Sequence, residues 1–364
     1  MRVILSPLNY QEHVQSRERS EVGFKVVQIS DLPGVSDYLK QAFQTTEVKY
    51  QMKLCSSEEE SIAAAHDADM LIVVPAFQPI PRKVIGGLPR CRYILDLISG
   101  YDAIDIEAAT EHGVLVTNMP DLFDQEVSDH TMALILACSR QIGELNQMAK
   151  RGEWVDDRIG SKLGRDIWPK LNRLQGQTLG IIGFGRVARS LVPKAKGFGM
   201  RLIAFDPYVA SSVLSEFGVE SVGLDQLLRE SDFVSVLTFL SEETRGMLGL
   251  EEFKKMKPTA YIINTARGPI INRDALYAAL IQGLIAGAGL DVTEPEPSTP
   301  ENNPLLSLDS VIITAHNAGV GKVAFANLTR LVPEQVFRVA RGEWPHNLIN
   351  PEVKEKYIQK WGLP

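Results

Sequence analysis

Residues 178–188 read TLGIIGFGRVA, and they are the strongest indication of the chain's architecture. Its apolar run, 178–182, predicts a buried strand that passes through two glycines directly into a helical segment. Gly183 permits the tight turn, and Gly185 lets the backbone approach a pyrophosphate, to which the helix N-terminus offers unpaired N–H groups. Ala188 stands where a third glycine is common. The stretch therefore predicts a dinucleotide-binding turn.

A carboxylate at the end of the next predicted strand indicates which dinucleotide binds. The strand 202–205 is followed by Asp206, 21 residues after Gly185, close to the separation of a ribose-binding acid. A carboxylate accepts hydrogen bonds from ribose hydroxyls and repels a 2′-phosphate, and residues 207–210 contain no Arg. We expect NAD rather than NADP. The alternative is that the glycines serve only a strand–helix turn and that Asp206 is a surface cap.

Short β-branched runs alternate with helical patterns along the chain, which predicts an α/β protein with parallel sheets. Three early strands are expected in a smaller α/β unit, at 70–74, 93–98 and 114–117. Residues 126–151 carry apolar positions at helical spacing and predict one long helix that links this unit to the next. Six further strands are expected at 178–182, 202–205, 233–237, 260–263, 286–290 and 311–313.

Composition narrows the classes of function. A chain of 364 residues exceeds what one core usually organises, so we expect two domains. Its formal net charge of −7 argues against nucleic acid or a membrane surface as partner, and favours a small molecule. Cys55, Cys91 and Cys138 form neither a disulfide framework nor a metal motif. No secretion signal or membrane span is evident, and we expect a cytoplasmic protein without a metal.

Three side chains of complementary chemistry follow the last predicted strands. Arg267 comes after the strand 260–263, and its guanidinium can donate hydrogen bonds to carboxylate and carbonyl oxygens. Glu296 follows the next strand, and His316 follows the last one. His suits proton exchange near neutral pH, and a neighbouring carboxylate would stabilise its imidazolium form. Because ligands bind beyond the carboxyl ends of parallel strands, we expect these residues to share one crevice.

The other histidines have a simpler interpretation. His13, His66, His112 and His346 are assigned to the surface or to packing, as is His130, although His130 sits on the linking helix. His316 differs because it follows a strand on the crevice side.

Four ordered motifs resemble those of the D-isomer-specific 2-hydroxyacid dehydrogenases. They are GFGRVA at 183–188, NTARG at 264–268, GLDVTEPEP at 289–297 and TAHNAG at 314–319. The resemblance covers essentially the whole chain. It implies an enzyme that transfers a hydride between NAD(H) and a small D-2-hydroxy or 2-keto acid.

The resemblance also implies an architecture. A flavodoxin-like, discontinuous substrate-binding domain would comprise residues 1–117 and 318–364. A doubly wound, Rossmann-type NAD-binding domain would comprise residues 118–317. Family members are commonly dimers through the long helix and the loop around it, so residues 126–170 are the expected homodimer surface.

Residue roles follow from the resemblance by matching positions. The family's catalytic Arg, Glu and His match Arg267, Glu296 and His316, and spacing selects Glu296 over Glu294. The backbone amides of Ser99 and Gly100 would hold the substrate carboxylate together with Arg267, and Asp291 would hold the nicotinamide carboxamide. The full set of expected cofactor contacts is Gly183, Gly185, Arg186, Val187, Asp206, Thr238, Thr265, Ala266, Asp291, His316 and Gly319.

Several positions depart from the family pattern. Residues 237–239 read LTF where many members have His-x-Pro, and Ile98 stands where the carboxylate loop often has glycine. Residues 75–81, PAFQPIP, carry no Arg, which disfavours phosphorylated substrates, although a phosphoglycerate dehydrogenase stays open as an alternative within the family. Two alternatives remain open. One is a non-enzymatic NAD(H)-sensing protein like the C-terminal-binding-protein corepressors. The other is a formate- or phosphite-type dehydrogenase, although the formate enzymes have Gln at the Glu296 position.

Overall fold

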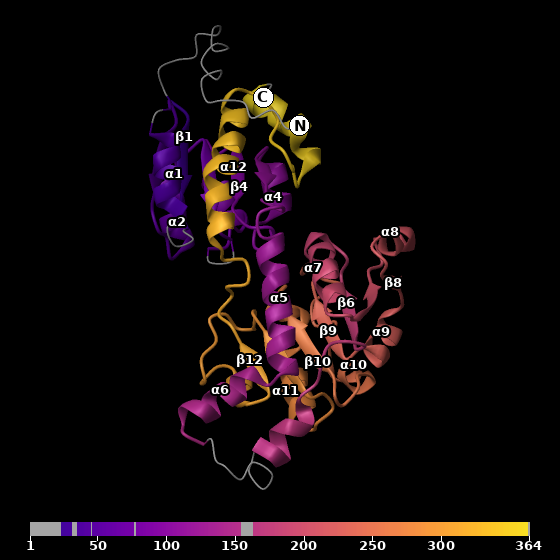
Figure 1. Cartoon of the computed structure of the whole chain (residues 1–364). Helices are drawn as coiled ribbons and strands as arrows, with labels where there is room; N and C mark the ends of the chain where they lie inside the picture. The colour runs from indigo at the N-terminus through magenta and orange to yellow at the C-terminus, as the bar shows by residue number, and fades with distance from the viewer. Residues whose placement is uncertain (1–22, 31–34, 45, 76–77, 154–162, 363–364) are drawn as a thin grey trace.

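The computed structural model describes residues 23–30, 35–44, 46–75, 78–153 and 163–362. These residues form two parallel sheets that lie in separate halves of an elongated molecule and carry helices on their faces (Figure 1). The expected α/β class is confirmed. His13, Ala76, Phe77 and part of the predicted dimer surface, residues 154–162, lie outside the described residues.

The first sheet has five strands in the order β2-β1-β3-β4-β5. This order is that of flavodoxin-like folds. Its strands are β1 (Lys25–Gln28), β2 (Lys49–Met52), β3 (Met70–Val73), β4 (Tyr93–Asp96) and β5 (Leu115–Thr117). The helices between them are α1 (Val35–Phe43), α2 (Glu58–Ala65), α3 (Arg82–Gly86) and α4 (Ile106–Glu111).

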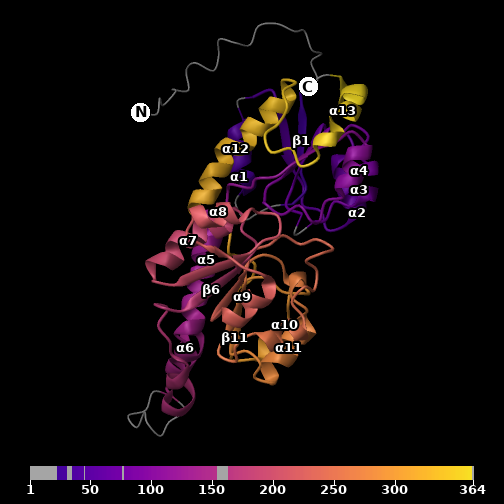
Figure 2. The same cartoon turned by 90° about the vertical axis from the view of Figure 1, so that its right-hand side faces the viewer.

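The C-terminal part of the chain returns to this first sheet. Helix α12 (Lys322–Ala340) lies beside α1 (Figures 1 and 2). Leu328, Val332 and Val336 of α12 are fully buried in one core with Val26 of β1 and Leu39 of α1. The short helix η6 (Pro351–Val353) and α13 (Lys354–Trp361) follow, and α13 lies near α4 (Figure 2). The burial of this segment stabilises the first sheet through apolar contact. The limits of the two domains stay a prediction.

The second sheet has seven strands in the order β12-β11-β10-β9-β6-β7-β8. Taken from the β8 edge, the strands β8-β7-β6-β9-β10-β11 follow the doubly wound dinucleotide-binding order. The strands are β6 (Thr178–Ile182), β7 (Arg201–Phe205), β8 (Glu220–Ser221), β9 (Phe233–Val236), β10 (Tyr261–Asn264), β11 (Gly287–Leu290) and β12 (Val311–Ile313). Its helices are α7 (Arg186–Gly197), α8 (Ser211–Glu216), α9 (Leu224–Glu230), α10 (Leu250–Lys255), α11 (Arg273–Ile281) and the short η4 (Gly268–Ile270) and η5 (Pro304–Ser307).

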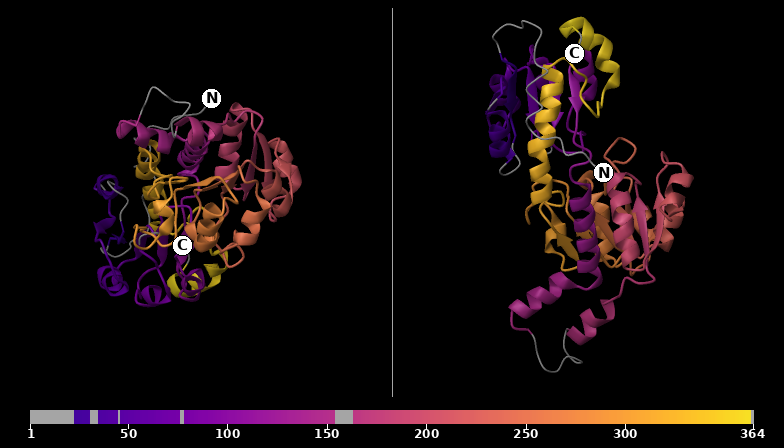
Figure 3. Two further views of the ribbon diagram at one scale, coloured as in Figure 1. Left: turned by 90° about the horizontal axis from the view of Figure 1, so that it is seen from below. Right: turned by 45° about the horizontal axis from the view of Figure 1, so that its top comes forward.

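The prediction of one helix over 126–151 is wrong. The segment forms α5 (Asp124–Ser139) and α6 (Ile142–Lys150), separated at Gln141, whose φ is 50°. The side-chain amide of Gln141 donates to the carbonyl of Cys138 at 2.7 Å and to the Tyr261 hydroxyl at 2.9 Å. These bonds satisfy the end of α5 and turn the chain, so α6 leaves α5 at an angle (Figure 3).

The strand predictions were incomplete. The first unit contains β1 and β2 in addition to the three expected strands, and the second sheet contains β8 in addition to the expected six. Strand β2 is partly exposed, and β8 is a two-residue, exposed edge strand. Edge strands such as β2 and β8 are buried on fewer sides, so their sequences lack the continuous apolar run that identifies a central strand. Strand β1 lies inside its sheet, but only Val26 and Val27 of its four residues are apolar.

The two units meet where their strands end. Asp102, which follows β4, accepts a hydrogen bond from Arg267, which follows β10. Helix α5 runs between the units (Figure 1). None of the described helices has the length and hydropathy needed to cross a membrane.

Candidate active site

The glycine turn after β6 has the geometry that a dinucleotide requires. Gly183 has a φ of 90°, and a Cβ there would lie 2.7 Å from the backbone of Thr238, so only glycine fits. At Gly185, the N-cap of α7, an added Cβ would meet no atom of the described residues within 4 Å. The first N–H groups of α7 have no intrahelical partner, so this open face suits the pyrophosphate of NAD.

Asp206 stabilises the same turn through hydrogen bonds to the backbone. Its Oδ2 accepts the amide of Phe184 at 2.7 Å, and its Oδ1 accepts the amide of Tyr208 at 2.9 Å. These bonds fix the carboxylate at the carboxyl ends of β6 and β7, beside the glycine turn. The sequence indicated the position of this acid but not its bond to the turn.

Other expected cofactor residues lie around this turn. Val187 is half-buried in the first turn of α7. The side chain of Arg186 pairs with Asp121 and, from Nε at 3.0 Å, with Asp124 at the start of α5. A contact of this guanidinium with a cofactor stays a prediction.

Asp291 organises the loop that carries His316. It is 2% exposed, and it accepts Asn317 N at 3.0 Å and Ala318 N at 2.8 Å, together with the Thr314 hydroxyl. His130 of α5 adds to this network, because its Nε2 lies 2.9 Å from the Thr314 hydroxyl and 3.5 Å from Asp291 Oδ1. The interpretation of His130 as a packing residue missed this contact. Gly319 lies nearby, where an added Cβ would meet the Phe123 ring at 3.3 Å.

His316 and Glu296 form a hydrogen-bonded pair. Nδ1 of His316 lies 2.9 Å from Oε2 of Glu296, and His316 N donates to the Asp291 carbonyl at 2.8 Å. His316 has a φ of 51°, a conformation that a non-glycine residue holds only when its surroundings enforce it. Burial alone raises the pKa of Glu296, but the hydrogen bond and charge of His316, with the Thr293 amide, bring that pKa below its ordinary value. Glu294 instead lies 3.9 Å from Arg245.

Arg267 lies close to this pair. Gly268 packs directly against the segment that leads to Glu296, because a Cβ on Gly268 would lie 2.0 Å from the Thr293 carbonyl oxygen. The positive charge of Arg267 contributes to the lowered pKa of Glu296. Ala266 accepts from Arg267 Nη1 at 2.9 Å, and Thr265 is buried with its hydroxyl 2.8 Å from that of Thr131.

The loop after β4 brings Ser99 and Gly100 to Arg267. A Cβ on Gly100 would lie 1.8 Å from Nη2 of Arg267, so the guanidinium rests against the glycine backbone. The loop is held from the other side by Asn118, whose Nδ2 donates to the Ser99 carbonyl at 2.6 Å. The structure therefore brings Arg267, Gly100, Glu296 and His316 to one junction between the two units.

Comparison with known proteins identifies the family. Residues 132–318 match the model of the NAD-binding domain of D-isomer specific 2-hydroxyacid dehydrogenases. The chain is 39% identical over 298 residues to a glyoxylate reductase of Korarchaeum cryptofilum, covering 82% of this chain and 87% of the relative. The chain belongs to the D-isomer-specific 2-hydroxyacid dehydrogenase family.

Two further members of the family illustrate its range. A D-3-phosphoglycerate dehydrogenase of Methanocaldococcus jannaschii is 39% identical over 84% of this chain and 56% of its own length. The structure of an Aquifex aeolicus D-lactate dehydrogenase with NAD and lactic acid superposes with a TM-score of 0.76, at 27% identity, over 87% of this chain and 96% of that one. This 2-hydroxyacid dehydrogenase is therefore an NAD-dependent enzyme, as its motifs predicted.

Proposed function

We propose that this dehydrogenase interconverts a small, unphosphorylated D-2-hydroxy acid and its 2-keto acid, with His316 as general acid and base. The observation that supports this most directly is the 2.9 Å contact between His316 Nδ1 and Glu296 Oε2 beside Arg267. An acid–base group, its carboxylate partner and a cation for the substrate's carboxylate are the groups that this chemistry needs.

His316 exchanges the proton through its second ring nitrogen. Because Nδ1 donates to Glu296, Nε2 keeps a lone pair and takes the hydroxyl proton during oxidation. During reduction the imidazolium returns that proton to the carbonyl oxygen. Glu296 holds the ring's orientation and stabilises the charged form. NAD(H), when bound, would accept or supply the hydride at this site.

Arg267, Ser99 and Gly100 bind the substrate. The backbone N–H groups of Ser99 and Gly100 donate hydrogen bonds to the substrate's carboxylate. Arg267, which lies against Gly100, contacts the carboxylate and carbonyl oxygens of the substrate. A guanidinium in contact with a glycine backbone offers donors to both oxygens from one direction. In the transition state the same charge stabilises the developing oxyanion.

Asp206 makes NAD the preferred cofactor over NADP. Its position supports this preference. Hydrogen bonds from the amides of Phe184 and Tyr208 hold the carboxylate beside the glycine turn, where its charge would repel a 2′-phosphate. Asp291 would hold the nicotinamide carboxamide, and Thr238, whose backbone lies against Gly183, would line the adenosine end.

The substrate class rests on the loop after β3 and on the relatives. Residues 75–81 supply no Arg for a phosphate, and Gln78 of this loop is buried. Glyoxylate is the substrate named for the Korarchaeum relative. The phosphoglycerate dehydrogenase relative makes phosphohydroxypyruvate the necessary comparison.

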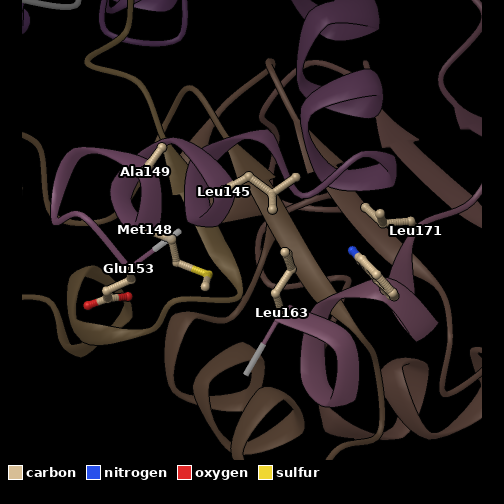
Figure 4. A pocket seen from close by; sticks show the side chains of 7 residues that line it. Leu145, Met148, Ala149, Glu153, Leu163 and Leu171 are labelled. Carbon is tan, nitrogen blue, oxygen red and sulfur yellow. The ribbon is translucent and has the colours of Figure 1, made fainter. Parts of the chain in front are cut away.

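The protein forms a homodimer through the surface around α6. Ile142 is 52% exposed and Trp168, in the short helix η3 (Trp168–Lys170), is 44% exposed. Between α6 and the π-helical turn η2 (Leu163–Ile167) lies a cavity of about 510 Å³, lined largely by apolar side chains such as Leu145, Met148 and Leu171 (Figure 4). Exposed apolar surface of this kind is typical of subunit interfaces.

The three free cysteines suit a reducing compartment such as the cytoplasm.

The test is NADH oxidation with a panel of keto acids: glyoxylate, hydroxypyruvate, pyruvate, phenylpyruvate and 3-phosphohydroxypyruvate. We expect turnover with at least one unphosphorylated acid and a loss of about 10²–10⁴-fold in kcat for His316→Ala. His66→Ala, at the C-terminal end of helix α2 and outside the candidate site, serves as the control. Retained turnover in His316→Ala would refute the assignment. No turnover with any acid of the panel would refute the proposed substrate class.

A further inference from the structure

One ion pair joins the two units at the candidate site. Nε of Arg267 donates to Oδ1 of Asp102 at 3.0 Å, although the residues are 165 positions apart. Both side chains are largely shielded, with 20% and 28% of their surface exposed. Asp102 belongs to the loop after β4, and Arg267 to the loop after β10. The bond therefore fixes the position of the Arg267 side chain relative to the loop that carries Ser99 and Gly100.

The remaining nitrogens of Arg267 have different environments. Nη1 donates to the carbonyl of Ala266 at 2.9 Å. Nη2 occupies the space that a Cβ of residue 100 would fill, and Oδ1 of Asp102 lies 3.1 Å from the same point. Two hydrogen bonds thus fix the guanidinium plane. Within the described part of the chain, Nη2 has no hydrogen-bond acceptor and remains available beside the Gly100 amide.

A second acid lies beneath the loop and does not compete for Arg267. Asp96 is fully buried at the end of β4, where its Oδ1 accepts Ile98 N at 2.8 Å. Its Oδ2 is buried and has no hydrogen-bond partner among the described residues. Burial raises the pKa of Asp96 well above its ordinary range; the charge of Arg267 opposes this rise and that of Asp102 adds to it. Asp102 is therefore the carboxylate that bonds to the guanidinium of Arg267, while Asp96 bonds to the backbone of its own loop.

We propose that Asp102 is the positioning residue for Arg267: it holds the guanidinium over Gly100 so that Nη2 meets the substrate's carboxylate at the Ser99–Gly100 amides. The inference rests on the proposed role of Arg267 in substrate binding. It assigns Asp102 no contact with the reacting atoms. Its effect on the reaction passes through Arg267, and displacement of a positioned group by about 1 Å can cost about 10²-fold in rate.

A double-mutant cycle tests this role. The variants Asp102→Ala, Asp102→Asn, Arg267→Gln and Asp102→Ala/Arg267→Gln are compared for kcat and KM with the best keto acid of the panel and NADH. We expect Asp102→Ala to lower kcat/KM for the keto acid by about 10–100-fold and to leave the KM for NADH unchanged. Asp102→Asn keeps an oxygen that accepts from Nε, so it should recover much of the loss. In the Arg267→Gln background, Asp102→Ala should have no further effect.

The controls separate this inference from the proposed function. Glu107→Gln removes an exposed acid five residues along the same segment, and its kcat/KM should match the wild type. Wild-type turnover in Arg267→Gln would refute the proposed role of Arg267 and, with it, the inference. If Arg267→Gln is impaired but Asp102→Ala is not, or if the Asp102→Ala loss is equal in both backgrounds, only the inference is overturned. Should Asp102→Ala fail to fold, Asp102→Asn in the same two backgrounds decides.

Discussion

His316 Nδ1 lies 2.9 Å from Glu296 Oε2, although the two residues lie in loops that follow different strands, β11 and β12. Adjacent parallel strands end at the same edge of the sheet, so loops 20 residues apart in sequence become neighbours. The pair depends on the positive φ of His316, which the bonds to Asp291 maintain.

Glu296→Gln tests the charge of this pair. Gln keeps an oxygen that can accept from His316 Nδ1, but the imidazolium form loses its counter-charge. We expect the kcat/KM for keto-acid reduction to fall about tenfold or more at pH 7, with the midpoint of its pH profile moved to lower pH. In the wild type, the lowered pKa of Glu296 keeps the carboxylate ionised into the acidic range, so the pair is lost only as the pH falls through that lowered value. Glu294→Gln is the matched control, and an identical profile in Glu296→Gln would contradict the assignment.

Gly100→Ala tests the contact with Arg267. The added Cβ would lie 1.8 Å from Nη2 and 2.7 Å from Cζ, so the flexible arginine must move while the backbone stays. We expect a change of less than about 1 kcal/mol in the free energy of unfolding. The kcat/KM should fall about 10²-fold. At Gly223 an added Cβ meets nothing within 4 Å, so Gly223→Ala is the control. Denaturant titration and keto-acid kinetics provide the two readouts, and full activity in Gly100→Ala would argue against this substrate geometry.

Asp206→Ser tests cofactor choice. The change removes the carboxylate that would repel a 2′-phosphate and also two hydrogen bonds to the turn. We expect the ratio of kcat/KM for NADH over NADPH to fall by about 10²-fold, since like-charge juxtaposition costs several kcal/mol. Glu220→Gln, which neutralises an exposed acid on β8, should leave the ratio unchanged. An unaltered ratio in Asp206→Ser would show that other residues select the cofactor.

Asp96→Asn tests the buried acid through the pH dependence of stability. Because the pKa of Asp96 is raised in the folded protein, its contribution is complete below the unfolded pKa, about 4, and declines as the pH rises towards the folded pKa. Asn undergoes no such loss. We therefore expect the stability of Asp96→Asn relative to wild type to increase between about pH 4 and pH 8. Urea unfolding of both proteins at about pH 4 and pH 8 measures the difference between their free energies of unfolding. If this difference stays constant or decreases as the pH rises, Asp96 is ionised in the native state.

Ile142→Asp and Trp168→Glu test the dimer surface. Each places a charge where an apolar contact is proposed, so we expect dimers of the wild type and monomers of the variants by multi-angle light scattering. Ile358→Asp changes an exposed apolar residue of α13, at the opposite end of the molecule from α6 (Figure 2), and should leave the dimer intact. A monomeric wild type would refute the proposed interface.

The α/β class, the glycine turn at Gly183 and the candidate residues Arg267, Glu296 and His316 were all predictable from the sequence alone. These features are local: a strand followed by a positive-φ glycine and a helix N-terminus is encoded within a dozen residues. The ends of parallel strands share one edge, so the order of motifs also predicted a common crevice. Exposed edge strands such as β8 and the break at Gln141 were not predictable in this way, because neither has a periodic apolar signal.

Contacts between residues that are distant in sequence are visible only in the folded chain. The bonds of Asp102 to Arg267 and of His130 to Thr314 join segments separated by 165 and 184 residues. Such contacts arise from the packing of the two units and of α5 against the second sheet, and no local pattern in the sequence encodes them. Among the described residues, Asp96 Oδ2 lacks a hydrogen-bond partner for the same reason, since burial is a property of the folded chain.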